Sequence, residues 1–209
     1  GSGTYAYTVD WGNGTREYVS ANTAQTKDYN ATSTFIVTVY GTYRPYFNNA
    51  GDRAKLIGLQ IGQRATNLSN AFYGCSALTT LVGYAGTAAV TNMAYMFADC
   101  AAFNQSVANF NTAAVTNMSA MFFSCAAFNQ SLAAFNMAAV ATITDMCIRC
   151  NLNAPGTTTN YDATLVAWAA QDLVNSLTFT NTYSKYGGDA GSGGQQARFQ
   201  ILLMELDSP

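Results

Sequence analysis

The chain has 209 residues, enough for one elongated domain or two small ones. Charged residues make up only 10% and hydrophobic residues 49%, but the aromatic content of 13% favours a packed core over disorder. The net charge of −2 provides no basic surface for nucleic acid, and no apolar run approaches the ~20 residues of a membrane span.

Residues 1–43 predict a β-rich N-terminal module. Large apolar residues alternate along its first expected strand, at Tyr5, Tyr7, Val9 and Trp11, and the segment 10–14 is a hairpin signal. A second strand is expected over 34–40, ended by Gly41. Residues 44–64 are interpreted as a junction whose apolar side chains begin the core of the next region: Leu56, Ile57, Leu59 and Ile61.

A tandem repeat organises the region 65–150. Cysteines recur at every twenty-fifth position, and other columns keep the same register: Leu68, Met93, Met118 and Ile143; Ala71, Met96, Met121 and Met146; Phe72, Phe97, Phe122 and Cys147. Met93, Met96, Phe97 and Cys100 follow the helical spacing i, i+3, i+4 and i+7 after Thr91, a good N-cap. Val107 and Phe110 predict a short extended piece. The sequence therefore predicts an α/β solenoid with one helix and one short strand in each coil.

Residues 151–209 are expected to form a C-terminal helical cap. Pro155 and Gly156 end the array, and 161–168 begin a helix with Leu165 and Trp168 on one face. A strand is expected at Leu177 and Phe179, and a last helix over 195–204. Such caps cover the apolar surface that a solenoid would otherwise expose at its ends.

The motif V-T-N-M-x-x-M-F-x-x-C-x-x-F-N-Q-S, read from Val90 and Val115, resembles the leucine-rich repeats of the bacterial surface-protein type. That family occurs in bacterial surface lipoproteins, in some protist surface proteins and in phage-encoded proteins. The resemblance covers 65–150 and implies a short leucine-rich-repeat-like solenoid. The segment before it is similar to the polycystic-kidney-disease-like β module that often precedes these repeats.

The cysteine column Cys75, Cys100, Cys125 and Cys150 is interpreted as a structural ladder of small buried side chains. Disulfide bonds and a metal or redox site are the alternatives, the latter because 147–150 is a C-x-x-C, although five cysteines leave one unpaired and histidine is absent. Asp10 with Asn13 is a weaker candidate for calcium. No catalytic arrangement, cofactor site or metal site is predicted, and the chain is expected not to be an enzyme.

Between Ala65 and Thr144 the only charged residue is Asp99. Such a neutral polar face suits burial against other subunits or hydrogen bonding to glycans, and low-charge composition alone is the plainer alternative. The expected contact patch repeats in adjacent coils: Asn104, Gln105, Asn129 and Gln130.

The sequence therefore favours a non-enzymatic structural and interaction protein of a virion or a cell surface, whose partners are the protein subunits of that assembly. A carbohydrate-binding module that recognises surface glycans is the alternative, because exposed Tyr and Trp beside Asn and Gln stack on and hydrogen-bond to sugars. No nucleic acid and no membrane insertion are expected.

Overall fold

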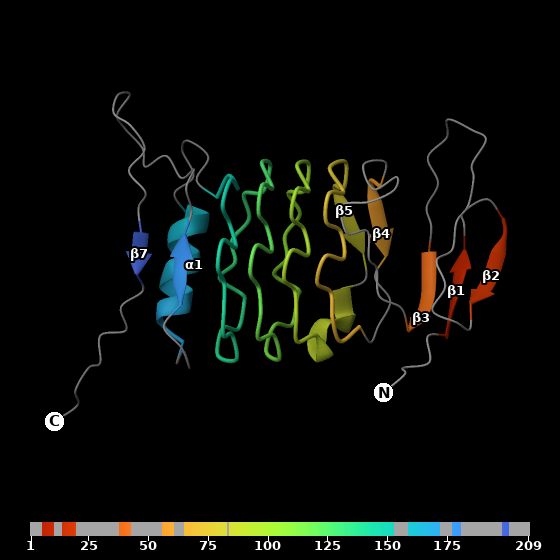
Figure 1. Ribbon diagram of the computed structural model, residues 1–209, viewed down its shortest axis with the longest axis horizontal. Coiled ribbons are helices and arrows are strands. Elements are labelled where there is room, and N and C mark those ends of the chain that lie inside the picture. The colour runs from red at the N-terminus through yellow and green to blue at the C-terminus, as the bar shows by residue number, and fades with distance from the viewer. Residues whose placement is uncertain are drawn as a thin grey trace.

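The computed structural model describes residues 6–10, 14–19, 38–42, 56–60, 65–82, 84–152, 159–171, 177–180 and 198–200. These segments form an elongated molecule in which a sheet, a row of stacked repeats and a helix follow one another along the long axis (Figure 1). The row of repeats, residues 65–152, is called the repeat stack below.

A five-stranded sheet of order β2-β1-β3-β4-β5 precedes and enters the repeat stack. Its strands are β1 (Ala6–Asp10), β2 (Arg16–Val19), β3 (Thr38–Thr42), β4 (Gly58–Gln60) and β5 (Thr80–Val82). β1 pairs antiparallel with β2 and β3, whereas β3–β4 and β4–β5 are parallel. Gly41 does not end β3 but lies inside it, paired with Tyr7. Because β5 belongs to the first repeat, the sheet joins the N-terminal strands to the repeat stack.

Successive repeats are joined by backbone hydrogen bonds on one side of the repeat stack. In each junction, alternate N–H groups of one repeat donate to carbonyls of the next repeat, as Leu68 does to Asn92 and Phe72 does to Met96. Isolated parallel bridges link Asn67 to Asn92, Asn92 to Asn117 and Asn117 to Thr142. The side-chain oxygens of these three asparagines accept from the N–H two residues later and so fix the same bend in each repeat.

The prediction of an α/β leucine-rich-repeat-like solenoid with one helix and one strand in each coil is wrong. Among the described residues, the segments expected to be helical, such as 93–100, are runs of turns, and the segments around Val107 and Phe110 hold no strand. Within a run, the N–H groups that do not bond to the next repeat donate to the carbonyl three residues back, as in Met96 to Met93 and Ala98 to Tyr95. Three-residue turns reproduce the spacing of a helical face, but half of the donors are used between repeats, so no α-helix forms.

Left-handed residues recur at two places in every run of turns. Their φ values lie between 51° and 77°, in two series with the repeat spacing: Asn70, Tyr95, Ala120 and Asp145, and then Gly74, Asp99, Ser124 and Arg149. An α-helix excludes such residues because L side chains in this region crowd the backbone.

A short 3-10 helix, η2 (Tyr84–Ala89), is the one helical segment in the described part of the first repeats.

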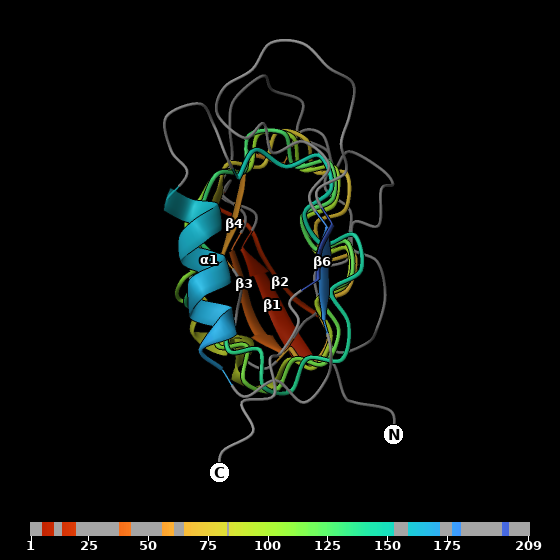
Figure 2. The same ribbon diagram turned by 90° about the vertical axis from the view of Figure 1, so that its left-hand side faces the viewer.

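Apolar columns fill the interior of the repeat stack. The aligned Leu, Met, Phe and Cys side chains are nearly all inaccessible to solvent and form one continuous core. Phe72, Phe97 and Phe122 stack with ring centroids 5.5 Å apart, and Phe103 and Phe128 form a parallel stack at 6.1 Å. Viewed along the long axis, the repeats follow nearly the same outline around this core (Figure 2). Each repeat therefore depends on its neighbours for burial.

The C-terminal part consists of α1 (Thr159–Ala169) and an antiparallel pair of strands, β6 (Thr178–Thr180) and β7 (Arg198–Gln200). The expected last helix over 195–204 is wrong for its described residues, because 198–200 form β7. α1 packs on the last repeat, on the same side of the molecule as β4, and β6 lies on the opposite side (Figure 2). Among the helices described, none has the length and apolar character to cross a membrane.

Candidate interaction site

The four amide residues expected to face a partner form hydrogen bonds between neighbouring repeats, although Asn104 is exposed and the other three are half-buried. The Gln105 side chain binds both backbone groups of Leu81: its Oε1 accepts from the N–H at 2.6 Å and its Nε2 donates to the carbonyl at 2.8 Å. Gln130 donates to the carbonyl and the side chain of Asn104, whose Oδ1 also accepts from the Asn129 N–H. The structure thus brings these residues together as links between repeats.

The cysteine column lies in the core, and all five cysteines are buried and outside any disulfide bond: Cys75, Cys100, Cys125, Cys147 and Cys150. Cys100 Sγ donates to the Phe72 carbonyl at 3.1 Å and Cys125 Sγ to the Phe97 carbonyl at 2.8 Å, so these thiols also link adjacent repeats. Burial raises the pKa of Cys100 and Cys125 well above the ordinary value, and a neighbouring thiol of the column raises each pKa further. These thiols are neutral and unreactive at neutral pH.

Of the calcium candidates Asp10 and Asn13, only Asp10 lies within the described residues, where it forms a salt bridge with Arg16 at 2.8 Å. No group of three or more metal-ligating side chains occurs in the part of the chain that the structure describes.

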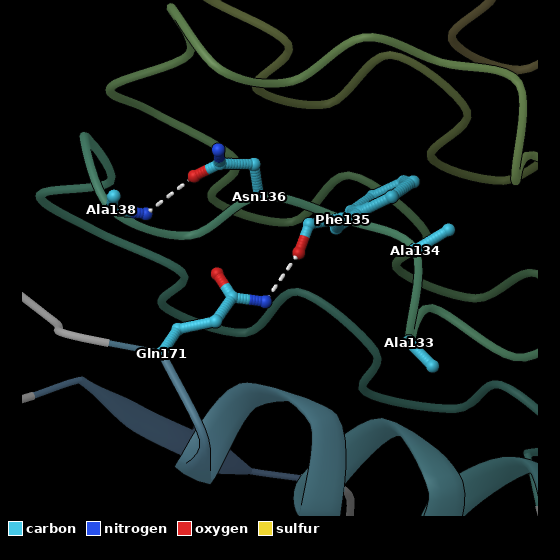
Figure 3. Close-up of a pocket in the computed structure, with 6 residues that line it drawn as sticks. All are labelled: Ala133, Ala134, Phe135, Asn136, Ala138 and Gln171. Atoms are coloured by element: carbon cyan, nitrogen blue, oxygen red, sulfur yellow. Dashed lines mark hydrogen bonds between the residues drawn. The ribbon is translucent and has the colours of Figure 1, made fainter.

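A hollow lies between the last repeat and the segment after α1, lined by Ala133, Ala134, Phe135, Asn136, Ala138 and Gln171 (Figure 3). Gln171 Nε2 donates to the Phe135 carbonyl at 2.9 Å, and Asn136 Oδ1 accepts from the Ala138 N–H at 3.0 Å. The hollow is lined by alanine methyl groups, the Phe135 ring and the amides of Asn136 and Gln171. Both amides form hydrogen bonds within the chain. The hollow therefore offers no acid, base or nucleophile.

A different set of side chains forms the most distinctive surface of the repeat stack. Tyr73, Tyr95, Phe123 and Arg149 come from four successive repeats and lie along the runs of turns; they are called the aromatic edge below. The rings of Tyr73 and Tyr95 are 6.2 Å apart and inclined by 36°, and the Arg149 guanidinium lies 5.9 Å from the centre of the Phe123 ring. Tyr95 is 45% exposed, Arg149 is exposed, and the other two side chains are half-buried.

The charges of the repeat stack gather on this same edge. Residues 65–152 contain three charged side chains, Asp99, Asp145 and Arg149, and all three stand at left-handed positions of the runs of turns. Asp145 and Arg149 are exposed, and Asp99 is half-buried. The remaining exposed surface of these repeats is Thr, Asn, Ser and Ala.

Tyr95 has a backbone conformation that a bulky side chain disfavours. Its φ is 56°, where the corresponding residue of the preceding repeat is Asn70, a residue that tolerates this region. A non-glycine residue there costs on the order of 1 kcal/mol, and packing offsets little of it because the ring is nearly half exposed. Stability alone therefore does not account for a tyrosine at this position.

Sequence reasoning missed the aromatic edge because it compared only residues at equivalent positions of the repeats. Tyr73 and Tyr95 are separated by less than one full repeat and belong to different columns, so no alignment of repeats pairs them. One feature of the sequence points to the aromatic edge. Tyr95 occupies a column in which the other repeats have small or polar residues: Asn70, Ala120 and Asp145.

Comparison with known proteins identifies a family whose function is unknown. A family model described as "Mycoplasma protein of unknown function, DUF285" matches residues 44–178. No curated protein and no solved structure matches the chain. The matched segment contains the repeat stack, α1 and the aromatic edge.

Proposed function

We propose that this chain, which belongs to the family of Mycoplasma proteins of unknown function DUF285, is a non-enzymatic interaction protein that binds a protein partner through its aromatic edge. The observation that carries the proposal is Tyr95: an exposed aromatic side chain held at a disfavoured left-handed position, beside the charges of an otherwise neutral repeat stack.

The composition of the edge fits a protein interface. Tyr, Phe and Arg are enriched in the energetically important centres of interfaces, where they bury a large area at a small cost in side-chain entropy. Asp145 and Arg149 supply one charge of each sign at the end of the edge, which orients a partner. Rings on successive repeats, at the ~4.8 Å separation of paired backbones, present a long narrow contact surface.

The neutral surface around the edge fits a role in an assembly. Exposed Thr, Asn, Ser and Ala can be buried against another subunit without desolvating a charge. We accordingly place the protein on a virion or a cell surface, with the other protein subunits of that assembly as partners. This location is part of the proposal, and it predicts co-purification of the chain with the particle or envelope fraction.

Binding of the purified chain to that particle or envelope tests the proposal. The double variant Tyr73→Ser, Tyr95→Asn should bind at least about tenfold more weakly, because loss of two aromatic anchors at an interface centre costs more than about 1.4 kcal/mol. The control is Asn109→Ser, an exposed residue away from the edge. Equal binding by the double variant and the wild type would rule out the aromatic edge as the contact surface.

A glycan is the second candidate ligand. The inclined Tyr73 and Tyr95 rings offer faces on which a sugar can stack, and the carboxylate of Asp99, in the same run of turns as Tyr95, can accept from hydroxyl groups. The target surface is treated either with periodate, which cleaves the vicinal diols of sugars, or with protease. Binding to the two treated surfaces distinguishes the glycan from the protein partner. Binding that is lost only after periodate would overturn the protein partner in favour of the glycan.

A further inference from the structure

The last repeat ends in a set of backbone groups that α1 satisfies with side chains. Thr164 Oγ1 accepts from the Leu132 N–H at 2.9 Å, and Trp168 Nε1 donates to the Leu132 carbonyl at 3.0 Å. After the helix, Gln171 accepts from the Met137 N–H at 2.7 Å and donates to the Phe135 carbonyl. At the other end of α1, Asn160 donates to the Asn129 carbonyl at 2.9 Å.

These bonds imitate those that one repeat makes to the next on this side of the repeat stack. Between repeats, too, side chains bond to backbone groups of the preceding repeat. The Gln105 amide binds the N–H and the carbonyl of Leu81, just as Thr164 and Trp168 together bind the N–H and the carbonyl of Leu132. Asn160, Thr164 and Trp168 follow one another at the i, i+4 spacing and therefore lie on one helix face. α1 occupies the place of a further repeat (Figure 1).

The inner and outer faces of α1 differ sharply. Thr164 and Trp168 are 0% and 1% exposed, whereas Val166 is 71% exposed and Ala163 is exposed on the outer face. Without α1, the backbone groups of 129–137 and the apolar surface beneath Trp168 would be uncovered together. A row of such unpaired groups beside apolar surface is a template for pairing with another chain.

We propose that α1 is a plug that closes a latent tail-to-tail interface between two copies of this chain. The occupant is the last repeat of a second copy, since the opposite end of the repeat stack is already taken: β5 pairs with β4, and the Thr79 N–H donates to the Ile57 carbonyl. Contact between two last repeats uses the same surface on both copies. Such a contact closes at a dimer and does not extend into a fibre.

The test removes the plug without shortening the chain. In Thr164→Glu, Trp168→Glu, two carboxylates at buried positions displace α1 from the last repeat. The control, Ala163→Glu, Val166→Glu, adds the same charge to the outer face. Molar mass is measured by light scattering over a concentration series. Labelling of Cys75, Cys100 and Cys125 in the same samples reports whether the repeats remain folded.

The expected result is a concentration-dependent dimer of the plug variant with its thiols still protected, and a monomeric control. A plug variant that stays monomeric with protected thiols would overturn the proposal. Aggregates with rapidly labelled thiols would also overturn it, because the repeats would then need the contacts of Tyr161 and Trp168 with their core in order to stay folded. Dimerisation of the control would show that charge on the helix, and not exposure of the last repeat, drives association.

Discussion

Single buried thiols affect how the free energy of unfolding depends on pH. Burial raises the pKa of Cys100, Cys125 and Cys150 above the ordinary value of 9.0. As pH rises through 9, the thiols of the unfolded chain lose protons while those of the folded chain keep them. The free energy of unfolding attributable to these groups is therefore constant below pH 9 and falls above it.

We expect the free energy of unfolding to fall more steeply above pH 9 in the wild type than in Cys100→Ala. Each thiol that ionises only in the unfolded chain contributes about 1.4 kcal/mol per pH unit to the slope, so the variant should lose that contribution. Denaturant unfolding at intervals from pH 7 to pH 10 measures both slopes. Parallel curves for the two proteins would mean that the Cys100 thiol also ionises in the folded state.

Tyr95 provides a second test at the scale of one residue, and it concerns folding and not binding. Tyr95→Asn places at this position the residue that the preceding repeat has at φ 57°. We expect its free energy of unfolding to equal or exceed that of the wild type, by up to about 1 kcal/mol, because relief of backbone strain offsets the lost contact with Tyr73. Thermal unfolding measures the difference. A clear drop in Tm would show that the ring serves stability.

At the scale of elements, the run of turns explains why the sequence predicted the contents of the core better than its secondary structure. The columns of Met, Phe and Cys mark buried positions whether the backbone between them is a helix or a series of turns. The choice between the two depends on hydrogen bonds from Leu68, Phe72 and their equivalents to carbonyls of the following repeat. A local pattern carries no information about such partners. The left-handed residues were the overlooked local sign, because Gly74 and Asn70 favour that conformation.

The left-handed series makes a prediction about glycine. Ser124 has φ 57° at the place where the first repeat has Gly74, so Ser124→Gly should raise the free energy of unfolding by about 0.5–1 kcal/mol. Ala126→Gly, two residues further on and exposed, should lower it by a similar amount, since glycine only adds freedom to the unfolded chain there. Denaturant unfolding measures both variants. Changes of opposite sign in the free energy of unfolding would support the turn geometry, and a decrease in both variants would contradict it.

For the molecule as a whole, burial shared between repeats makes the repeat stack one cooperative unit. Met121 is inaccessible to solvent in the middle of it, and Met121→Asp should unfold all the repeats, because an unpaired buried carboxylate costs several kcal/mol. Asn109→Asp adds the same charge at an exposed position and should change stability by less than about 0.5 kcal/mol. Circular dichroism and thiol labelling compare the two variants. Similar melting of both would refute the assignment of inward and outward positions.

In the runs of turns, equivalent backbone donors and acceptors keep one separation from junction to junction, and this regularity has a genetic consequence. Because each run of turns presents to its successor the same backbone groups that it received from its predecessor, a tandem duplication or deletion of one whole repeat leaves both ends of these runs with suitable neighbours. Unequal recombination within the gene can thus lengthen or shorten the protein in steps of one repeat while the reading frame and the fold survive. An insertion of any other length shifts every later donor away from its acceptor, so selection should admit variation in the number of repeats far more readily than variation in the size of one.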